Sequence, residues 1–98
     1  MSSSMNSVAL LREQIHATYQ EYINAILNID FDIKQNNISR DDELIEEFYK
    51  IGVENLQILL DSKFETDAEV LKQMLARLRE NIDKSVDLEY KIRAKFKI

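Results

Sequence analysis

Apolar residues recur along the first third of the chain at alternating steps of three and four, which is the spacing of one face of an α-helix. The series consists of Val8, Leu11, Ile15, Tyr19, Tyr22, Ile26, Ile29 and Ile33. It predicts a helix over residues 7–34. Apolar and acidic residues alternate over residues 29–33, so a short extended piece after Asn28 is an alternative. We expect continued helix instead, because a lone short strand would have no partner.

Asn36 and Asn37 interrupt this pattern, and Ser39 followed by acidic residues resembles the start of a second helix. The pattern predicts this helix over residues 40–60. Its apolar stripe consists of Leu44, Ile45, Phe48, Ile51, Leu56, Leu59 and Leu60. Gly52 lies on or near the stripe, and a glycine costs a helix about 1 kcal/mol. We therefore expect either a bend at Gly52 or the close approach of another backbone.

A third helix is predicted over residues 67–96. The segment that precedes it has the form of a capping box, in which the Thr66 hydroxyl and the Glu69 carboxylate each bind the other residue's backbone N–H. Apolar residues then recur at steps of four and three from Leu71 onward. Ser85 and Glu89 fall on the same seam, so the buried face must rotate or loosen in the last third of the helix.

The composition agrees with an all-helical chain. The 98 residues include no proline, no cysteine and one glycine, so tight turns between strands are disfavoured, and 45% of the residues are hydrophobic, which suffices for a core. We predict a single all-α domain over residues 1–98. It is expected to be an elongated antiparallel three-helix bundle with coiled-coil-like helices, which oligomerisation could complete. Residues 1–6 are expected to be flexible.

Three long helices can leave an apolar seam exposed, and such seams commonly mark binding sites for other proteins. We therefore expect a non-enzymatic interaction module: a subunit, adaptor or small chaperone that packs its helix faces against itself or a partner protein. The candidate interface residues are Leu71, Leu75, Leu78, Ile82, Val86 and Ile92.

Charge is distributed unevenly along the chain. The net charge is −5, and residues 41–69 hold ten acids and two lysines, whereas residues 91–97 hold four basic residues and no acid. Most such charges are solvated helix faces. Two alternatives are head-to-tail association of the acidic and basic ends, and a small acidic inhibitor or immunity-type protein that neutralises a basic partner. The candidate acidic face consists of Asp42, Glu43, Glu46 and Glu47. Nucleic acid binding is disfavoured, because the rest of the chain would repel phosphate.

One motif suggests metal chemistry. Glu13 and His16 form a Glu-x-x-His pattern of the kind that holds carboxylate-bridged metals in helical bundles, and acids such as Glu43, Glu46 or Glu47 could complete the set. The pattern is frequent by chance, and both residues fall beside the predicted core face. No phosphate-binding loop or nucleophile motif accompanies it. We predict no enzymatic activity, cofactor or metal, and keep a helical metal protein or enzyme as the second alternative.

Targeting signals are not evident in the sequence. The first residues lack a basic run followed by an apolar stretch, and nowhere do about 18 apolar residues follow one another. We therefore expect an intracellular, cytoplasmic protein without membrane insertion.

Overall fold

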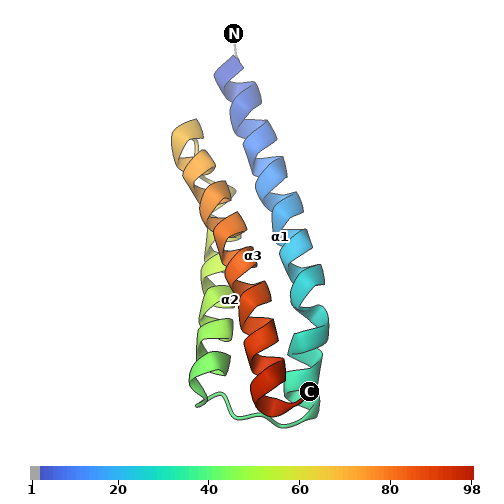
Figure 1. Cartoon of the computed structure of the whole chain (residues 1–98). Helices are drawn as coiled ribbons and strands as arrows, with labels where there is room; N and C mark the ends of the chain where they lie inside the picture. The colour runs from blue at the N-terminus through green and yellow to red at the C-terminus, as the bar shows by residue number, and fades with distance from the viewer. Residues whose placement is uncertain (1–2) are drawn as a thin grey trace.

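The computed structural model describes residues 3–98, with side chains from residue 7 onward. In this part the chain forms three helices, α1 (Ser3–Gln35), α2 (Glu43–Ser62) and α3 (Ala68–Phe96), and no strand. Consecutive helices run antiparallel, so that α1 and α3 lie parallel to each other, in a bundle that measures 55 × 20 × 18 Å (Figure 1). The prediction of an elongated all-α three-helix bundle is confirmed. The flexibility expected at residues 1–6 falls in part on Met1 and Ser2, which lie outside the described residues.

α1 is continuous through Ile33, so the extended piece considered after Asn28 does not form. The chain then turns at Asn37, whose φ of 53° is in the left-handed region that asparagine tolerates. α2 begins at Glu43 rather than at residue 40. The reason is that Ser39 belongs to the turn, where its hydroxyl accepts a hydrogen bond from the backbone N–H of Asp41.

Both later helices are capped by an aspartate. The Asp42 carboxylate accepts hydrogen bonds from the backbone N–H groups of Leu44 and Ile45, at 2.9 and 3.3 Å. The predicted capping box before α3 is off by one residue, since Asp67 is the cap and accepts from the N–H of Glu69 at 2.9 Å. The Glu65 carboxylate, and not that of Glu69, binds the two N–H groups that precede the helix.

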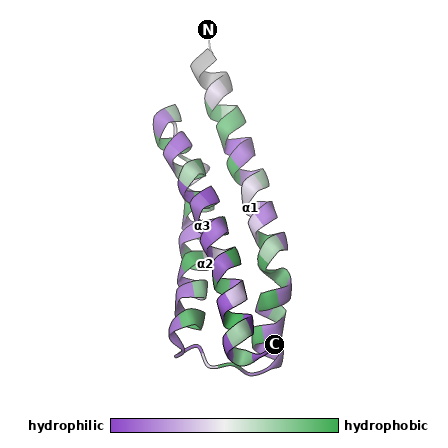
Figure 2. Cartoon of the chain, viewed as in Figure 1, coloured by the Kyte–Doolittle hydropathy of each residue, from purple (hydrophilic) through white to green (hydrophobic). Residues whose placement is uncertain are grey.

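The core consists of two apolar clusters, one at each end of the bundle. The cluster near the α1–α2 turn contains Ile29, Ile33, Ile45, Phe48, Ile51, Leu88 and Ile92. The cluster near the α2–α3 turn contains Leu11, Ile15, Ile58, Leu71, Leu75 and Leu78. α3 packs against both other helices and presents hydrophilic residues on the outside, as Figure 2 shows. None of the helices in the described chain has the length and apolar character needed to cross a membrane.

Candidate protein-interaction surface

The apolar face of α3 closes the core of the chain itself. Leu71, Leu75, Leu78 and Ile92 are each at most 5% exposed. Ile82 is half-buried, and Val86 is exposed. Of the six residues proposed from the sequence as partner contacts, four therefore pack against α1 and α2 in the single chain. A partner could not reach them without opening the bundle.

A polar layer lies between the two apolar clusters, where α2 meets α3. Asn55 of α2 and Asn81 of α3 are both fully buried, and the Asn81 side-chain amide donates a hydrogen bond to Oδ1 of Asn55 at 2.8 Å. The same amide donates to the Glu54 carboxylate at 3.0 Å. Ser85, one turn further along α3, is buried beside them. The buried seam of α3 thus runs through Asn81 in place of Ile82 and through Leu88 in place of Glu89. Ser85, whose polarity was one reason to expect a rotation, stays buried.

The layer extends to α1 through Tyr22. A Cβ atom on Gly52 would lie 3.0 Å from the Tyr22 hydroxyl oxygen, so a tyrosine side chain, and not a backbone, explains the glycine. Burial, together with the neighbouring Tyr19, raises the pKa of Tyr22 to about 12. Three buried atoms of the layer, Nδ2 of Asn55, Oδ1 of Asn81 and Oγ of Ser85, have no hydrogen-bond partner among the described residues. Buried polar groups are most stable when each is hydrogen-bonded, so this layer is less favourable than the apolar clusters on either side of it.

Because Asn55 faces inward, the residues buried in the next turns of α2 differ from those that the sequence predicted. Asn55, Ile58 and Ser62 are buried, whereas Leu56 and Leu60, which were expected in the core, are 45% and 44% exposed. The expectation for these two leucines was wrong.

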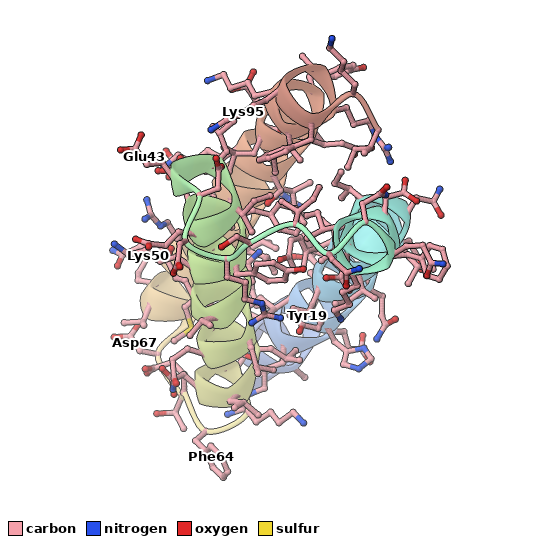
Figure 3. All side chains as sticks on the ribbon, turned by 90° about the horizontal axis from the view of Figure 1, so that it is seen from below. Tyr19, Glu43, Lys50, Phe64, Asp67 and Lys95 are labelled. Carbon is pink, nitrogen blue, oxygen red and sulfur yellow. The ribbon has the colours of Figure 1, made fainter. Side chains whose placement is uncertain are left out.

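Three exposed apolar side chains line the outside of α2, and a fourth follows directly after the helix. Val53, which is 71% exposed, Leu56 and Leu60 are spaced by three and four residues, which places them on one side of the helix. Phe64, which is 84% exposed, lies in the turn two residues beyond the end of the helix at Ser62. We call these four residues the outer stripe. It faces away from the core, and Figure 3 shows Phe64 projecting from the bundle at the end of α2 opposite Glu43.

The stripe ends toward the α1–α2 turn at Tyr49, which is half-buried. The Tyr49 hydroxyl donates a hydrogen bond to the Asp30 carboxylate at 2.6 Å, and the Arg40 guanidinium lies 4.2 Å from the centre of the tyrosine ring. Burial and the Asp30 carboxylate raise the pKa of Tyr49 to about 12. These contacts hold Tyr49 against α1, so it is not part of the exposed stripe.

Three carboxylates occupy the first turns of α2. Glu43, Glu46 and Glu47 are exposed, and none of them forms an ion pair with a side chain in residues 7–98. We call them the acidic end. The fourth residue of the predicted acidic face, Asp42, is engaged as the helix cap and in an ion pair with Lys95. This ion pair and the cap bonds lower the pKa of Asp42 below its ordinary value.

Three of the four basic residues near the end of α3 are paired within the chain. Lys91 contacts Asp87 at 3.0 Å, and Arg93 contacts both Glu89 and Asp32 at 2.9 Å. Lys95 forms an ion pair with Asp42, so the basic end of α3 meets the start of α2 in the same molecule. Most of the basic charge considered for head-to-tail association therefore already has an intramolecular partner.

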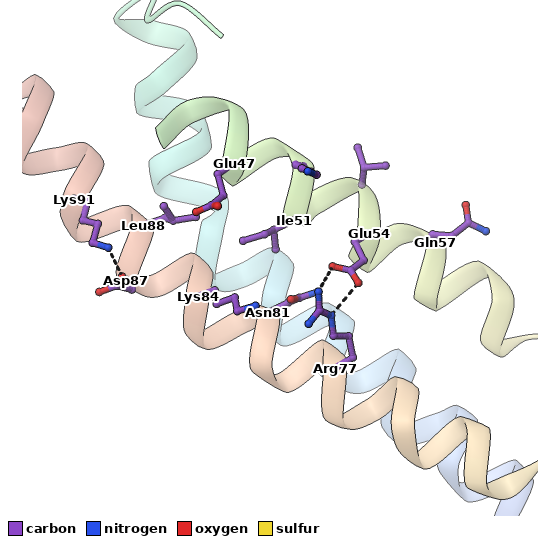
Figure 4. A pocket seen from close by; sticks show the side chains of 12 residues that line it. Glu47, Ile51, Glu54, Gln57, Arg77, Asn81, Lys84, Asp87, Leu88 and Lys91 are labelled. Carbon is purple, nitrogen blue, oxygen red and sulfur yellow. Dashed lines mark hydrogen bonds and ion pairs between the residues drawn. The ribbon is translucent and has the colours of Figure 1, made fainter. Parts of the chain in front are cut away.

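A groove of about 950 Å³ separates the outer sides of α2 and α3 (Figure 4). Ile51, Leu88 and Asn81 form part of its lining. Arg77 bridges it by donating to both carboxylate oxygens of Glu54, at 2.9 and 3.2 Å. This hydrogen bond lowers the pKa of Glu54. The groove is thus spanned by an ion pair that joins the two helices.

Glu13 and His16 lie exposed on α1, beside a smaller hollow of about 380 Å³. Arg12 in the same hollow donates to the backbone carbonyls of Ser62 and Glu65, at 3.1 and 2.6 Å, and so binds the C-terminal end of α2. No group of three or more potential metal ligands comes together within the described residues. Glu13 and His16 therefore have no third ligand among the described residues.

Comparison with known proteins returns no relative. No protein-family model, no curated protein and no solved structure matches the chain.

Proposed function

We propose that the chain is a non-enzymatic helical interaction module, acting as a subunit, adaptor or small chaperone, that binds a partner protein through the outer stripe of α2. The observation that supports this most is the exposure of Val53, Leu56 and Leu60 on one helix face, with the exposed Phe64 directly after the helix. A contiguous apolar patch commonly marks an interaction site. This proposal moves the contact from α3, whose apolar face is buried, to α2.

The alignment of these residues distinguishes them from ordinary exposed apolar side chains. Single exposed residues such as Leu10 are normal on protein surfaces, and exposed apolar residues also occur as pairs four residues apart, Leu27 with Phe31 and Val86 with Tyr90. The outer stripe instead has three such residues over seven residue steps, or about 10 Å of helix, and Phe64 directly after the helix. A partner helix can bury such a stripe along its length, and each fully buried large apolar side chain contributes roughly 1.5–3 kcal/mol.

The second candidate function is a small acidic inhibitor that neutralises a basic partner. The exposed carboxylates of Glu43, Glu46 and Glu47, which form no ion pair with a side chain in residues 7–98, favour it. Charge alone would then dominate recognition, so affinity would fall steeply with salt and would not depend on Leu56 or Leu60.

Site-specific photo-crosslinking tests the proposed docking surface. A photoreactive amino acid is placed at Leu56 on the stripe, and at Leu27 on the outside of α1 as a matched exposed control. We expect a discrete adduct in the expressing cells from position 56 only. The captured protein is then purified separately, and its affinity is measured for the wild type, Leu60→Glu and Leu27→Glu.

The expected result is a loss of about tenfold or more in affinity for Leu60→Glu, equivalent to about 1.4 kcal/mol, with Leu27→Glu close to wild type. Circular dichroism should show unchanged helicity, because both side chains are exposed. Equal binding by all three proteins would contradict docking on the stripe.

A further inference from the structure

The outer stripe and the acidic end form one continuous surface along α2. Glu46, Val53 and Leu60 are spaced by seven residues, and a seven-residue step returns to nearly the same side of a helix. Glu46 therefore continues the line of the stripe toward the start of α2. Leu56 lies ten residues beyond Glu46, or about 15 Å along the helix axis. From Glu43 to Leu60 the surface measures seventeen residue steps, or about 26 Å, so a single helical segment of about five turns can span both parts.

The two parts demand different chemistry from a partner. The stripe requires apolar side chains, whereas Glu43, Glu46 and Glu47 present three exposed carboxylates without an ion-pair partner in residues 7–98. Arg40 and Lys50 are the nearest cations in sequence, each three residues from one of these carboxylates, and both are exposed. Cations on the partner would therefore meet unneutralised charge, and complementary charge raises specificity and the rate of association.

Helix dipoles indicate the direction of the partner segment. Cations are favoured at the C-terminal end of a helix, where the dipole is negative. If the cationic end lies over Glu43, Glu46 and Glu47, the partner helix runs antiparallel to α2. In this arrangement the negative end of the partner's dipole also meets the positive end of α2.

A second copy of this chain fits the surface poorly. Its own α2 carries the same excess of acid, so stripe-to-stripe pairing brings carboxylates toward carboxylates. Its α3 does end in cations, but the apolar face of that helix is buried and Lys91, Arg93 and Lys95 are paired internally. A different protein satisfies both parts better.

We propose that the occupant of this surface is an amphipathic helix with a cationic C-terminal end, from a different protein, that lies antiparallel to α2 with its apolar side on Val53, Leu56, Leu60 and Phe64. This inference rests on the proposed function and adds the chemical class and direction of the partner.

Three synthetic helical peptides test it. All carry leucines at alternating steps of three and four. One has lysines in its last two turns, the second has them in its first two turns, and the third has glutamine in their place. Their dissociation constants for the full chain are measured by fluorescence anisotropy at two salt concentrations. Charges are weakly screened at about 50 mM salt and strongly screened at about 500 mM salt.

We expect the peptide with C-terminal lysines to bind about tenfold more tightly than the other two at low salt, a factor typical of a few complementary charges. The triple variant Glu43→Gln, Glu46→Gln, Glu47→Gln should abolish this preference. The matched control Glu13→Gln, Glu21→Gln, Asp83→Asn removes the same amount of charge from exposed positions elsewhere. This control should still prefer the peptide with C-terminal lysines.

The possible failures are distinguishable. If all three peptides bind equally and Leu56→Glu with Leu60→Glu abolishes binding, the inferred partner class is overturned while docking on the stripe stands. If the lysine preference survives in the Glu43, Glu46, Glu47 variant, or if no peptide binds, the inference is also overturned. The photo-crosslinking result decides the proposed function in each case.

Discussion

Asn81 and Asn55 join α3 to α2 through a buried hydrogen bond of 2.8 Å. With Asn55 in the core, Leu56 and Leu60 are left outside. The side of α2 that carries the buried polar contact thus lies opposite the exposed apolar surface that we propose as the docking site. In coiled coils, buried asparagines select one alignment of the helices and reduce stability.

Breaking this pair on one side should destabilise the bundle more than replacing it on both sides. We expect Asn55→Ala to reduce the free energy of unfolding by about 1–3 kcal/mol, because the Asn81 amide loses a buried partner. The double variant Asn55→Leu, Asn81→Leu should be neutral or stabilising, since two apolar groups need no partner. Urea denaturation measures both. If the double variant loses at least as much free energy of unfolding as the single variant, the polar pair is a net stabiliser.

Gly52 offers a second test of the polar layer. Gly52→Ala should gain up to about 1 kcal/mol of helix propensity, but its Cβ would meet the Tyr22 hydroxyl. In the wild type we expect Gly52→Ala to give no net gain in the free energy of unfolding. In a Tyr22→Phe background, where the hydroxyl is absent, the gain should approach the full contribution of helix propensity. Thermal unfolding of the four proteins in this cycle provides the comparison. The same effect of Gly52→Ala in both backgrounds would mean that Tyr22 is not the obstacle.

Arg12 attaches α1 to the end of α2 through two carbonyl groups, and this contact depends on the shape of the guanidinium group. Arg12→Lys keeps the charge but cannot donate to Ser62 and Glu65 in the same forked geometry. We expect Arg12→Lys to reduce the free energy of unfolding by about 1–2 kcal/mol and to speed amide hydrogen exchange in the last turn of α2. Arg79→Lys, at an exposed site on α3, is the control. Equal stability of the two variants would contradict a capping role for Arg12.

Acid should weaken the fold partly through Asp42. The hydrogen bond from Lys95 and those from the backbone lower its folded-state pKa below the ordinary 3.8. A lowered carboxyl pKa contributes stability above the ordinary value, and this contribution is lost as the pH falls through the folded-state pKa. Asp42→Asn can still cap α2, since asparagine is a good cap, but it does not titrate.

We therefore expect the free energy of unfolding to fall between about pH 5 and pH 2 in the wild type, and to fall less steeply in Asp42→Asn. Urea titrations at several pH values measure the two slopes. Parallel curves would indicate that Asp42 does not contribute to the acid response, and that Glu54 and Asp30, whose pKa values are also lowered, account for it.

The three helices could be predicted because their signals are local. Apolar periodicity sets each helix, and Asn36, Asn37 and the segment before Asp67 mark the breaks. The cap positions were each displaced slightly, because the choice between neighbouring aspartate, serine and threonine side chains depends on the geometry of the turn. Asp42 and Asp67 act as the caps, whereas Ser39 and Thr66 do not.

The inward side of α2 could not be predicted from its own sequence. Leu56 and Leu60 are better core residues by hydropathy than Asn55 and Ser62, yet the asparagine and the serine are buried. The partner of Asn55 is Asn81, twenty-six residues away, and periodicity within one helix does not reveal such a pair. One signal was present: between Val53 and Leu60 apolar residues lie all around the helix, more than one buried face can accommodate.

The absolute mass of the purified chain, measured by light scattering over a wide range of concentration, tests whether the outer stripe is open in the free protein. We predict a helical monomer of 11.5 kDa at every concentration, because a second copy brings like charge to α2. A stable dimer that Leu56→Glu with Leu60→Glu dissociates would contradict the account, since the stripe would then be covered by the chain itself and closed to a different protein.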